Sequence, residues 1–164
     1  MDDKFTSTYD ADFLVWTEQQ ARALRALAKN RANLPNELDL EHVIEEIEDL
    51  GRSELNAVRS QIRNIMIHLI KAACDGESRA AAHWAVEARA FHGAMIDKVT
   101  PAMRTRLELQ KLWAQARRYA SADLVAFGRS SPDWLPSQCP FEPEDFVEEF
   151  LDYAKLASRL SPPA

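Results

Sequence analysis

Side chains that could hold a metal ion or a basic partner gather in one acidic segment of the chain, residues 39–54. At the spacing of an α-helix, its charged positions form a strip along the edge of an apolar face. Two interpretations of this strip are open: a row of carboxylates that binds a ligand, or a solvated helix edge with ion pairs such as Glu48–Arg52. A pair of that kind contributes only about 0.2–0.5 kcal/mol, and the pattern favours the solvated edge. The strip comprises Glu41, Glu45, Glu48, Arg52, Arg59 and Arg63.

Three further titratable residues follow this segment. His68 lies at the margin of an apolar helix with Lys71 one turn on. It could act as an acid or base near neutral pH, although a hydrogen-bonded structural histidine is the favoured interpretation. His83 and Glu87 have the i,i+4 spacing that could hold one edge of a metal site. A hydrogen-bonded surface pair accounts for the same spacing and is favoured.

The motifs that would identify a reaction are missing from the sequence. It contains no Glu-x-x-His pair of a di-iron bundle and no HExxH zinc motif. It also lacks the GxSxG elbow, the phosphate-binding loop and the GxGxxG fingerprint. The sequence therefore assigns no catalytic residue and no cofactor, leaves the identity of any metal open, and does not decide whether the protein is an enzyme.

Composition predicts one globular domain over residues 1–164. Apolar residues make up 46% and charged residues 28% of the 164, which is typical of a folded domain of ordinary size. The sequence has no apolar run near the ~20 residues that a membrane-spanning helix needs. Its first residues do not resemble a secretory signal, so we expect a cytoplasmic location. Cys74 and Cys139 are then expected to be free thiols.

Charge is segregated along the chain. The net charge of −6 disfavours binding to nucleic acid, which depends on basic residues. Residues 37–54 hold eight acids and one base, and residues 142–152 hold six acids and no base. Residues 100–120 hold five bases and one acid. These segments could pair within one chain or between two.

The spacing of apolar residues predicts a long helix through this acidic segment. From Leu40 to Leu69 they recur every three or four positions, in phase through Gly51. The alternative is a helix that ends at Gly51 and a second one capped by Ser53. Glycine inside a helix costs about 1 kcal/mol relative to alanine, so its place on the apolar face suggests close approach by another helix. The second half, about residues 53–74, is apolar on nearly every side and is expected to be central.

The remaining segments predict the other helices of an all-α bundle, with five to six helices in total around the central one. The first begins at Asp10 and turns Phe13, Trp16, Leu24 and Leu27 inward. Others are expected over residues 81–99 and 101–127, the latter closed by Gly128. A last acidic helix from about Pro143 carries Phe146, Val147, Phe150, Ala154 and Ala157 inward. Residues 129–142 are an irregular proline-rich stretch, in which Trp134 either pins the loop to the bundle or forms a binding hot spot.

Several of these residues also match a known family. The chain has Asp10-x-x-Phe13-x-x-Trp16, then Glu-Glu-Ile-Glu-Asp-Leu-Gly at residues 45–51, and His68-Leu69-Ile70-Lys71. With Cys139-Pro140-Phe141 near the end, this pattern resembles the bacterial "domain of unknown function 29" family. The resemblance implies a bacterial, cytosolic, all-helical protein. It implies no reaction and no catalytic residue.

Two classes of function follow as hypotheses. The first is a non-enzymatic module for protein interaction or self-association, motivated by the segregated charge. The second is a metal-binding helical bundle or metal-dependent enzyme that uses Glu45 and Glu48. The polar residues singled out as a candidate cluster are Glu45, Glu48, Arg52, His68, His83 and Glu87.

Overall fold

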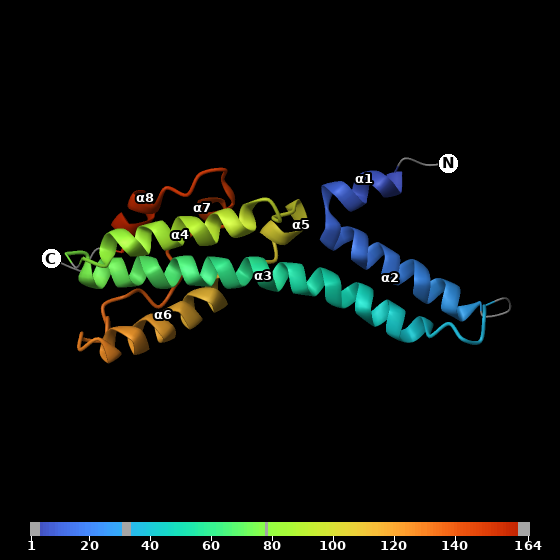
Figure 1. Ribbon diagram of the computed structural model, residues 1–164, viewed down its shortest axis with the longest axis horizontal. Helices are drawn as coiled ribbons and strands as arrows, with labels where there is room; N and C mark the ends of the chain where they lie inside the picture. Colours follow the sequence, from blue (N-terminus) through green and yellow to red (C-terminus); the bar gives the residue numbers. More distant parts are fainter. Residues whose placement is uncertain (1–3, 31–33, 78, 161–164) are drawn as a thin grey trace. The chain divides into compact units, whose positions relative to one another are not determined.

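The protein is all-helical in a computed structural model that describes residues 4–30, 34–77 and 79–160. These residues form eight helices and contain no strand, which confirms the predicted fold class (Figure 1). Two of the eight have only four residues, so the number of longer helices is close to the five or six expected. The helices are α1 (Lys4–Ala11), α2 (Phe13–Lys29), α3 (Leu40–Asp75), α4 (Ala81–Ile96), α5 (Pro101–Arg104), α6 (Leu109–Ala126), α7 (Glu144–Val147) and α8 (Tyr153–Ser158).

Helix α3 runs without a break through Gly51 for 36 residues, as the apolar spacing predicts. Asp39 begins it, because its carboxylate accepts a hydrogen bond from the His42 amide at 3.3 Å and so satisfies a free first-turn donor. The second half is the apolar core helix that the sequence predicts. Its side chains with at most 8% exposure are Leu55, Val58, Ile62, Ile65, Met66, Leu69 and Ile70.

The chain groups into two compact units, each built from two stretches of sequence. Unit 1 contains Met1–Ala57 and Thr100–Arg106, and unit 2 contains Val58–Val99 and Leu107–Ala164. Helix α3 contributes its first half to unit 1 and its second half to unit 2. A single domain over residues 1–164 stays a prediction.

In unit 1, helix α2 lies beside the first half of α3 (Figure 1). The buried face of α2 consists of Leu14, Thr17 and Ala21. The predicted inward stripe is wrong for Leu27, which is 45% exposed. The face of α2 that packs closely against α3 therefore has the smaller side chains. The aromatic residues of α2 pack against Tyr9 of α1 instead.

Those aromatic residues form a small cluster with the preceding helix. Tyr9 of α1 meets the Phe13 ring edge-on at 5.5 Å and the Trp16 ring edge-on at 4.8 Å. Phe13 and Trp16 stack on each other at 5.7 Å. Such pairs add about 0.5–1.5 kcal/mol beyond the area they bury, so this packing accounts for the spacing of Phe13 and Trp16.

The predicted helix start at Asp10 is wrong, because α1 continues through Ala11 and Asp12 caps α2 instead. One Asp12 oxygen accepts from the Val15 amide at 3.2 Å, and the other accepts from the Ala102 amide of α5 at 2.8 Å. The Asp12 carboxylate, two residues after the predicted Asp10, thus accepts hydrogen bonds from the first turns of both α2 and α5.

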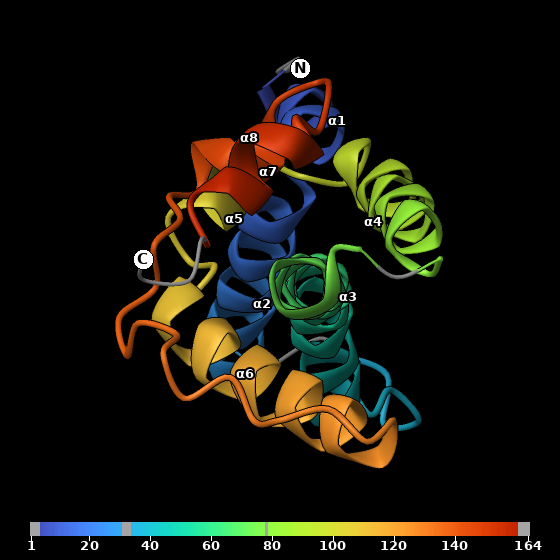
Figure 2. The same ribbon diagram turned by 90° about the vertical axis from the view of Figure 1, so that its left-hand side faces the viewer.

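In unit 2, helices α4 and α6 lie on different sides of α3 (Figure 2). Helix α8 packs on the same core, since the Tyr153 hydroxyl donates to the His68 carbonyl at 3.0 Å. His92 of α4 is 5% exposed and bonds the Glu148 carbonyl at 2.9 Å. This buried histidine was not singled out by the sequence pattern.

The proline-rich stretch, residues 129–142, is irregular as predicted. Helix α6 holds it: the Trp113 indole donates to the Pro136 carbonyl at 2.9 Å, and Gln110 bonds Ser137 and Cys139. Within the stretch, Leu135 is buried and Trp134 is half-buried. Pinning by Trp134 itself stays a prediction, because these contacts come from α6.

Two predicted helices are each divided in the structure. The helix expected over 101–127 stops at Arg104, and α6 begins only at Leu109, after Glu108 with a positive φ of 56°. Turning the chain there buries Leu107, which is 1% exposed. Gly128 closes α6 as expected, with φ of 74°.

The last acidic helix divides into α7 and α8. The intervening residues change the phase, so Phe150 is 70% exposed and Ala154 is also exposed, contrary to prediction. Leu151, Tyr153 and Leu156 are buried instead.

None of the helices in the described ranges is both long enough and apolar enough to cross a membrane.

Candidate functional site

The six predicted site residues fall into two groups, one in each unit. Glu45, Glu48 and Arg52 lie on the first half of α3, and His68, His83 and Glu87 lie on α3 and α4 of unit 2. Each group lies within one compact unit and is therefore a separate candidate site.

In unit 1 two members of the acidic strip, Glu48 and Arg52, form ion pairs. Both oxygens of Glu48 bond the Arg25 guanidinium of α2 at 2.7 Å, instead of the predicted partner Arg52. Arg52 pairs with Asp49, one turn earlier on its own helix. The Arg25 hydrogen bonds are the main reason that the pKa of Glu48 lies below its usual value, with a smaller contribution from Arg52. A metal ion at Glu48 would have to compete with this guanidinium for the carboxylate oxygens.

The first turn of α3 is also engaged within the chain. The Asp39 carboxylate contacts the His42 imidazole at 2.6 Å, and this bond raises the pKa of His42 and lowers that of Asp39. The exposed Glu45 adds to the rise at His42 through its charge. Both side chains of the pair are well exposed, so solvent screens the interaction.

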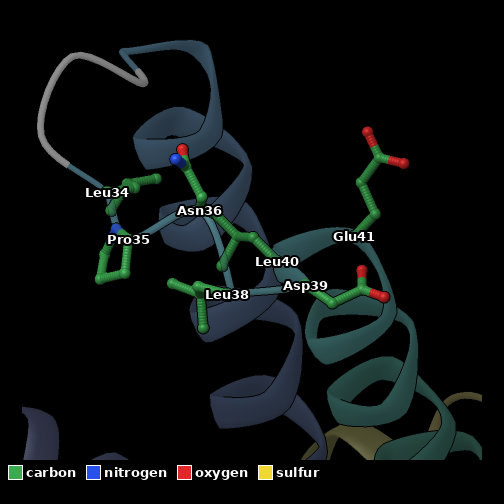
Figure 3. Close-up of a pocket in the computed structure, with 7 residues that line it drawn as sticks. All are labelled: Leu34, Pro35, Asn36, Leu38, Asp39, Leu40 and Glu41. Carbon is green, nitrogen blue, oxygen red and sulfur yellow. The ribbon is translucent and has the colours of Figure 1, made fainter.

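A pocket of about 360 Å³ opens beside this turn (Figure 3). In Figure 3 the Asp39 and Glu41 carboxylates lie at the helix end of the pocket, and Leu34, Pro35 and Leu38 come from the preceding loop. Its polar part is the capped start of a helix, which is sufficient to explain the residues found there.

In unit 2 the structure brings His68, Glu87 and His83 together. Nε2 of His68 lies 3.5 Å from one Glu87 oxygen, and Nε2 of His83 lies 3.3 Å from the other. His83 is 69% exposed, whereas the His68 side chain is only 12% exposed. Glu87 thus faces one histidine of its own helix and one from α3.

His68 is held by packing more than by polar bonds. Its ring stacks on Phe91 at 5.4 Å, and its Nδ1 is buried without a hydrogen-bond partner within the described structure. Burial is the largest cause that lowers the pKa of His68. The charge of Glu87 is the second-largest cause and raises the pKa, whereas Lys71 and His83 lower it further and Asp123 has a small raising effect. A neutral imidazole that packs against a ring fits the favoured structural interpretation of His68.

This environment makes a pH dependence testable. Because the folded-state pKa of His68 lies below its unfolded value of about 6.5, the unfolded chain binds more protons between the two values. His68 therefore contributes stability that is present above pH 6.5 and is lost as the pH falls through the folded-state pKa. We expect His68→Gln to flatten the decline of Tm between about pH 7 and pH 5.

The matched control for this prediction is His83→Gln, which removes the exposed histidine from the same carboxylate. Thermal unfolding of the three proteins, followed by circular dichroism across this pH range, measures the effect. Parallel Tm curves for wild type and His68→Gln would show that His68 is not the group responsible.

Across residues 4–30, 34–77 and 79–160, no three His, Cys, Asp or Glu side chains are placed to hold a metal ion. The two thiols are also poor nucleophiles, since burial raises the pKa of Cys139 and raises that of Cys74 to about 11.

Unit 2 also contains an apolar pocket that the sequence pattern did not indicate. It has a volume of about 290 Å³ and opens between α3, α4 and α6; we call it the Trp84 pocket. Its lining is mainly apolar, and Phe127 at its edge is 78% exposed. The lining residues are Lys71, Asp75, Ala80, Trp84, Leu124, Phe127 and Arg129.

Two ion pairs lie at the edge of the Trp84 pocket. Nζ of Lys71 lies 2.5 Å from Asp123 of α6, and Arg129 bonds Asp75 at 3.0–3.1 Å. The cations and carboxylates are equal in number, so the charged edge is neutral overall. Trp84 is half-buried, because it forms a wall of this pocket.

The described residues thus define an all-α protein with ion-paired polar groups and an apolar surface pocket. The family model described as "Domain of unknown function DUF29" matches residues 8–151, and the chain belongs to this family. This confirms the resemblance seen in the sequence.

A solved structure is closely similar. It is the crystal structure of an alpha-helical protein of unknown function from Rhodospirillum rubrum ATCC 11170. The two chains are 39% identical, with a TM-score of 0.89, over 94% of this chain and 98% of the other. The comparison with curated proteins gives no match.

Proposed function

We propose that this protein is a non-enzymatic interaction module that associates with a second copy of itself through the Trp84 pocket. The observation that carries the proposal is Phe127, whose ring is 78% exposed at the edge of an apolar pocket. Aromatic side chains beside apolar pockets are typical of the energetic centres of protein interfaces. Burying such a ring fully would contribute about 1.5–3 kcal/mol.

Two-fold symmetry makes a second copy a suitable occupant. In a symmetric dimer the same patch faces itself, so the Phe127 of each copy can contact the pocket of the other. A patch that contains both an exposed ring and an apolar recess next to it is self-complementary in this sense.

Charge also supports self-association at this place. Two chains of net charge −6 repel each other over most of their surface. At the Trp84 pocket the pairs Lys71–Asp123 and Arg129–Asp75 balance, so repulsion is weak there.

The segregation of charge along the chain is not the evidence for self-association. Members of the three charged segments find partners outside the other segments: Glu48 pairs with Arg25, and Asp145 pairs with Arg159. Arg106 pairs with Glu18. Their charges are thus partly neutralised within the chain and are not needed for a partner.

The test is the oligomeric state of wild type and Phe127→Ser. We expect wild-type protein to form a dimer in light scattering coupled to gel filtration, with the dimer fraction rising with concentration. Phe127→Ser should weaken the dimer about tenfold or more, since the loss of one buried ring can exceed 1.4 kcal/mol.

The matched control is Phe150→Ser, which removes a ring of similar exposure, 70%, that does not line the pocket. It should leave the dimer intact. A wild-type protein that stays monomeric at about 1 mM would overturn the proposal, as would equal effects of the two variants.

The metal-binding alternative on Glu45 and Glu48 has less support. Arg25 bonds both oxygens of Glu48, and a metal ion would have to displace it. We expect this protein to act in the bacterial, cytoplasmic setting that the sequence predicts.

A further inference from the structure

A second pocket in unit 2, of about 310 Å³, opens between α3 and α6. It is lined by Arg63, Gln115, Arg118, Tyr119 and Ala122. The lining thus contains two guanidinium groups and no carboxylate. We call it the Arg63 pocket.

Arg63 is held in place by neutral groups. One of its terminal nitrogens donates to the Ser60 hydroxyl at 3.1 Å, and the other donates to the Gln115 side-chain oxygen at 3.4 Å. Its guanidinium also lies over the Tyr119 ring, 5.7 Å from the centroid. These contacts fix the position of the group without neutralising its charge.

Most other arginines with a described side-chain partner bond a carboxylate. Arg63 and Arg118 have no ion pair within the part of the chain that the structure describes, although the chain carries 26 acids against 20 bases. Arg63 and Arg118 differ from other arginines without a described ion pair because both line the same pocket. The paired arginines are Arg25, Arg52, Arg59, Arg106, Arg129 and Arg159.

We propose that the Arg63 pocket binds the phosphate group of a small phosphate monoester. Two guanidinium groups match the charge of a phosphate dianion, and the planar fork of arginine can give two parallel hydrogen bonds to its oxygens. Tyr119 is 56% exposed and offers an apolar ring face and a hydroxyl beside this position. A recess of this volume holds about ten water molecules, which leaves space for a small organic group.

This site is independent of the proposed dimer, because it shares no lining residue with the Trp84 pocket. Either proposal can therefore fail without the other.

The experiment is calorimetric titration of the whole chain at low salt with three probes: inorganic phosphate, ribose 5-phosphate and adenosine 5′-monophosphate. We expect a monoester to bind with a Kd of about 1 mM or tighter. Arg63→Gln and Arg118→Gln should each weaken this binding about tenfold, a typical effect of losing one charge-assisted bond.

Arg117→Gln is the matched control, because it removes the same charge from the neighbouring position on α6 but does not line the pocket. It should bind as wild type does. If inorganic phosphate binds as tightly as the monoesters, the site is for the free anion and the organic part of the proposal is overturned. If nothing binds at about 10 mM, or if Arg117→Gln weakens binding as much as Arg118→Gln, the pocket is not a phosphate site.

Discussion

Replacing Gly51 with alanine is expected to lower the free energy of unfolding by about 1–3 kcal/mol, although alanine is the better helix former. A Cβ atom at Gly51 would overlap Oγ1 of Thr17 and lie 3.2 Å from Cδ1 of Leu14. Thr17 is 1% exposed, and its hydroxyl donates to the Leu14 carbonyl at 2.8 Å. The threonine can move away only by giving up this bond, so the overlap is costly.

The control for this prediction is a second helical glycine. A Cβ atom at Gly93 of α4 would meet nothing within 4 Å, so Gly93→Ala should raise stability by about 0.5–1 kcal/mol through helix propensity alone. Urea unfolding of both variants, followed by circular dichroism, measures the contrast.

A double-mutant cycle with Thr17→Ala locates the cause. Removing the hydroxyl should relieve the overlap, so the double variant Thr17→Ala/Gly51→Ala should be more stable than the sum of the single effects implies. If Gly51→Ala is as stabilising as Gly93→Ala, α2 does not approach α3 as closely as described.

Replacing Trp113 with alanine should have the largest effect on stability, a loss of about 3–5 kcal/mol. Trp113 is 0% exposed. Its ring meets the Phe141 ring edge-on at 5.7 Å, and Phe141 in turn meets Phe146 at 5.6 Å. The substitution would remove a large side chain from this core and the bond from its indole to the Pro136 carbonyl.

Two further variants separate packing from hydrogen bonding. Trp113→Phe keeps most of the apolar volume and should lose less than Trp113→Ala. Trp84→Ala removes the same side chain from a half-buried pocket wall and should cost much less, as is usual away from the core. Equal losses for Trp84→Ala and Trp113→Ala, measured by urea unfolding, would contradict this account.

The parts of the fold that were predictable are those governed by local periodicity and capping. Helix α3 continues through Gly51 because its apolar positions stay in phase, and the Thr100–Pro101 start and the Gly128 end are set by neighbouring residues. The break at Glu108 was not predictable in this way. Its positive φ occurs at a residue that is not glycine, and the gain comes from burying Leu107, which depends on the tertiary core.

In the candidate sites, too, contacts between different helices could not be predicted from local sequence. The i,i+4 pair of His83 and Glu87 could be read from one helix, but its contact with His68 comes from another helix. Arg25 was missed as the partner of Glu48 because 23 residues separate them. The two pockets combine residues from different helices, and no spacing within one segment indicates them.

The division of unit 1 into two stretches of sequence has a consequence for how the chain is made. Residues 1–57 leave the ribosome well before residues 100–106, which complete the unit. Until then Asp12 lacks the Ala102 amide and Glu18 lacks the Arg106 guanidinium. Closing a loop of this length has an entropic cost that grows only slowly with its size. A newly made chain therefore carries unit 1 incomplete through the synthesis of α4, and a fragment cut at Ala57 would lack both of these partners permanently.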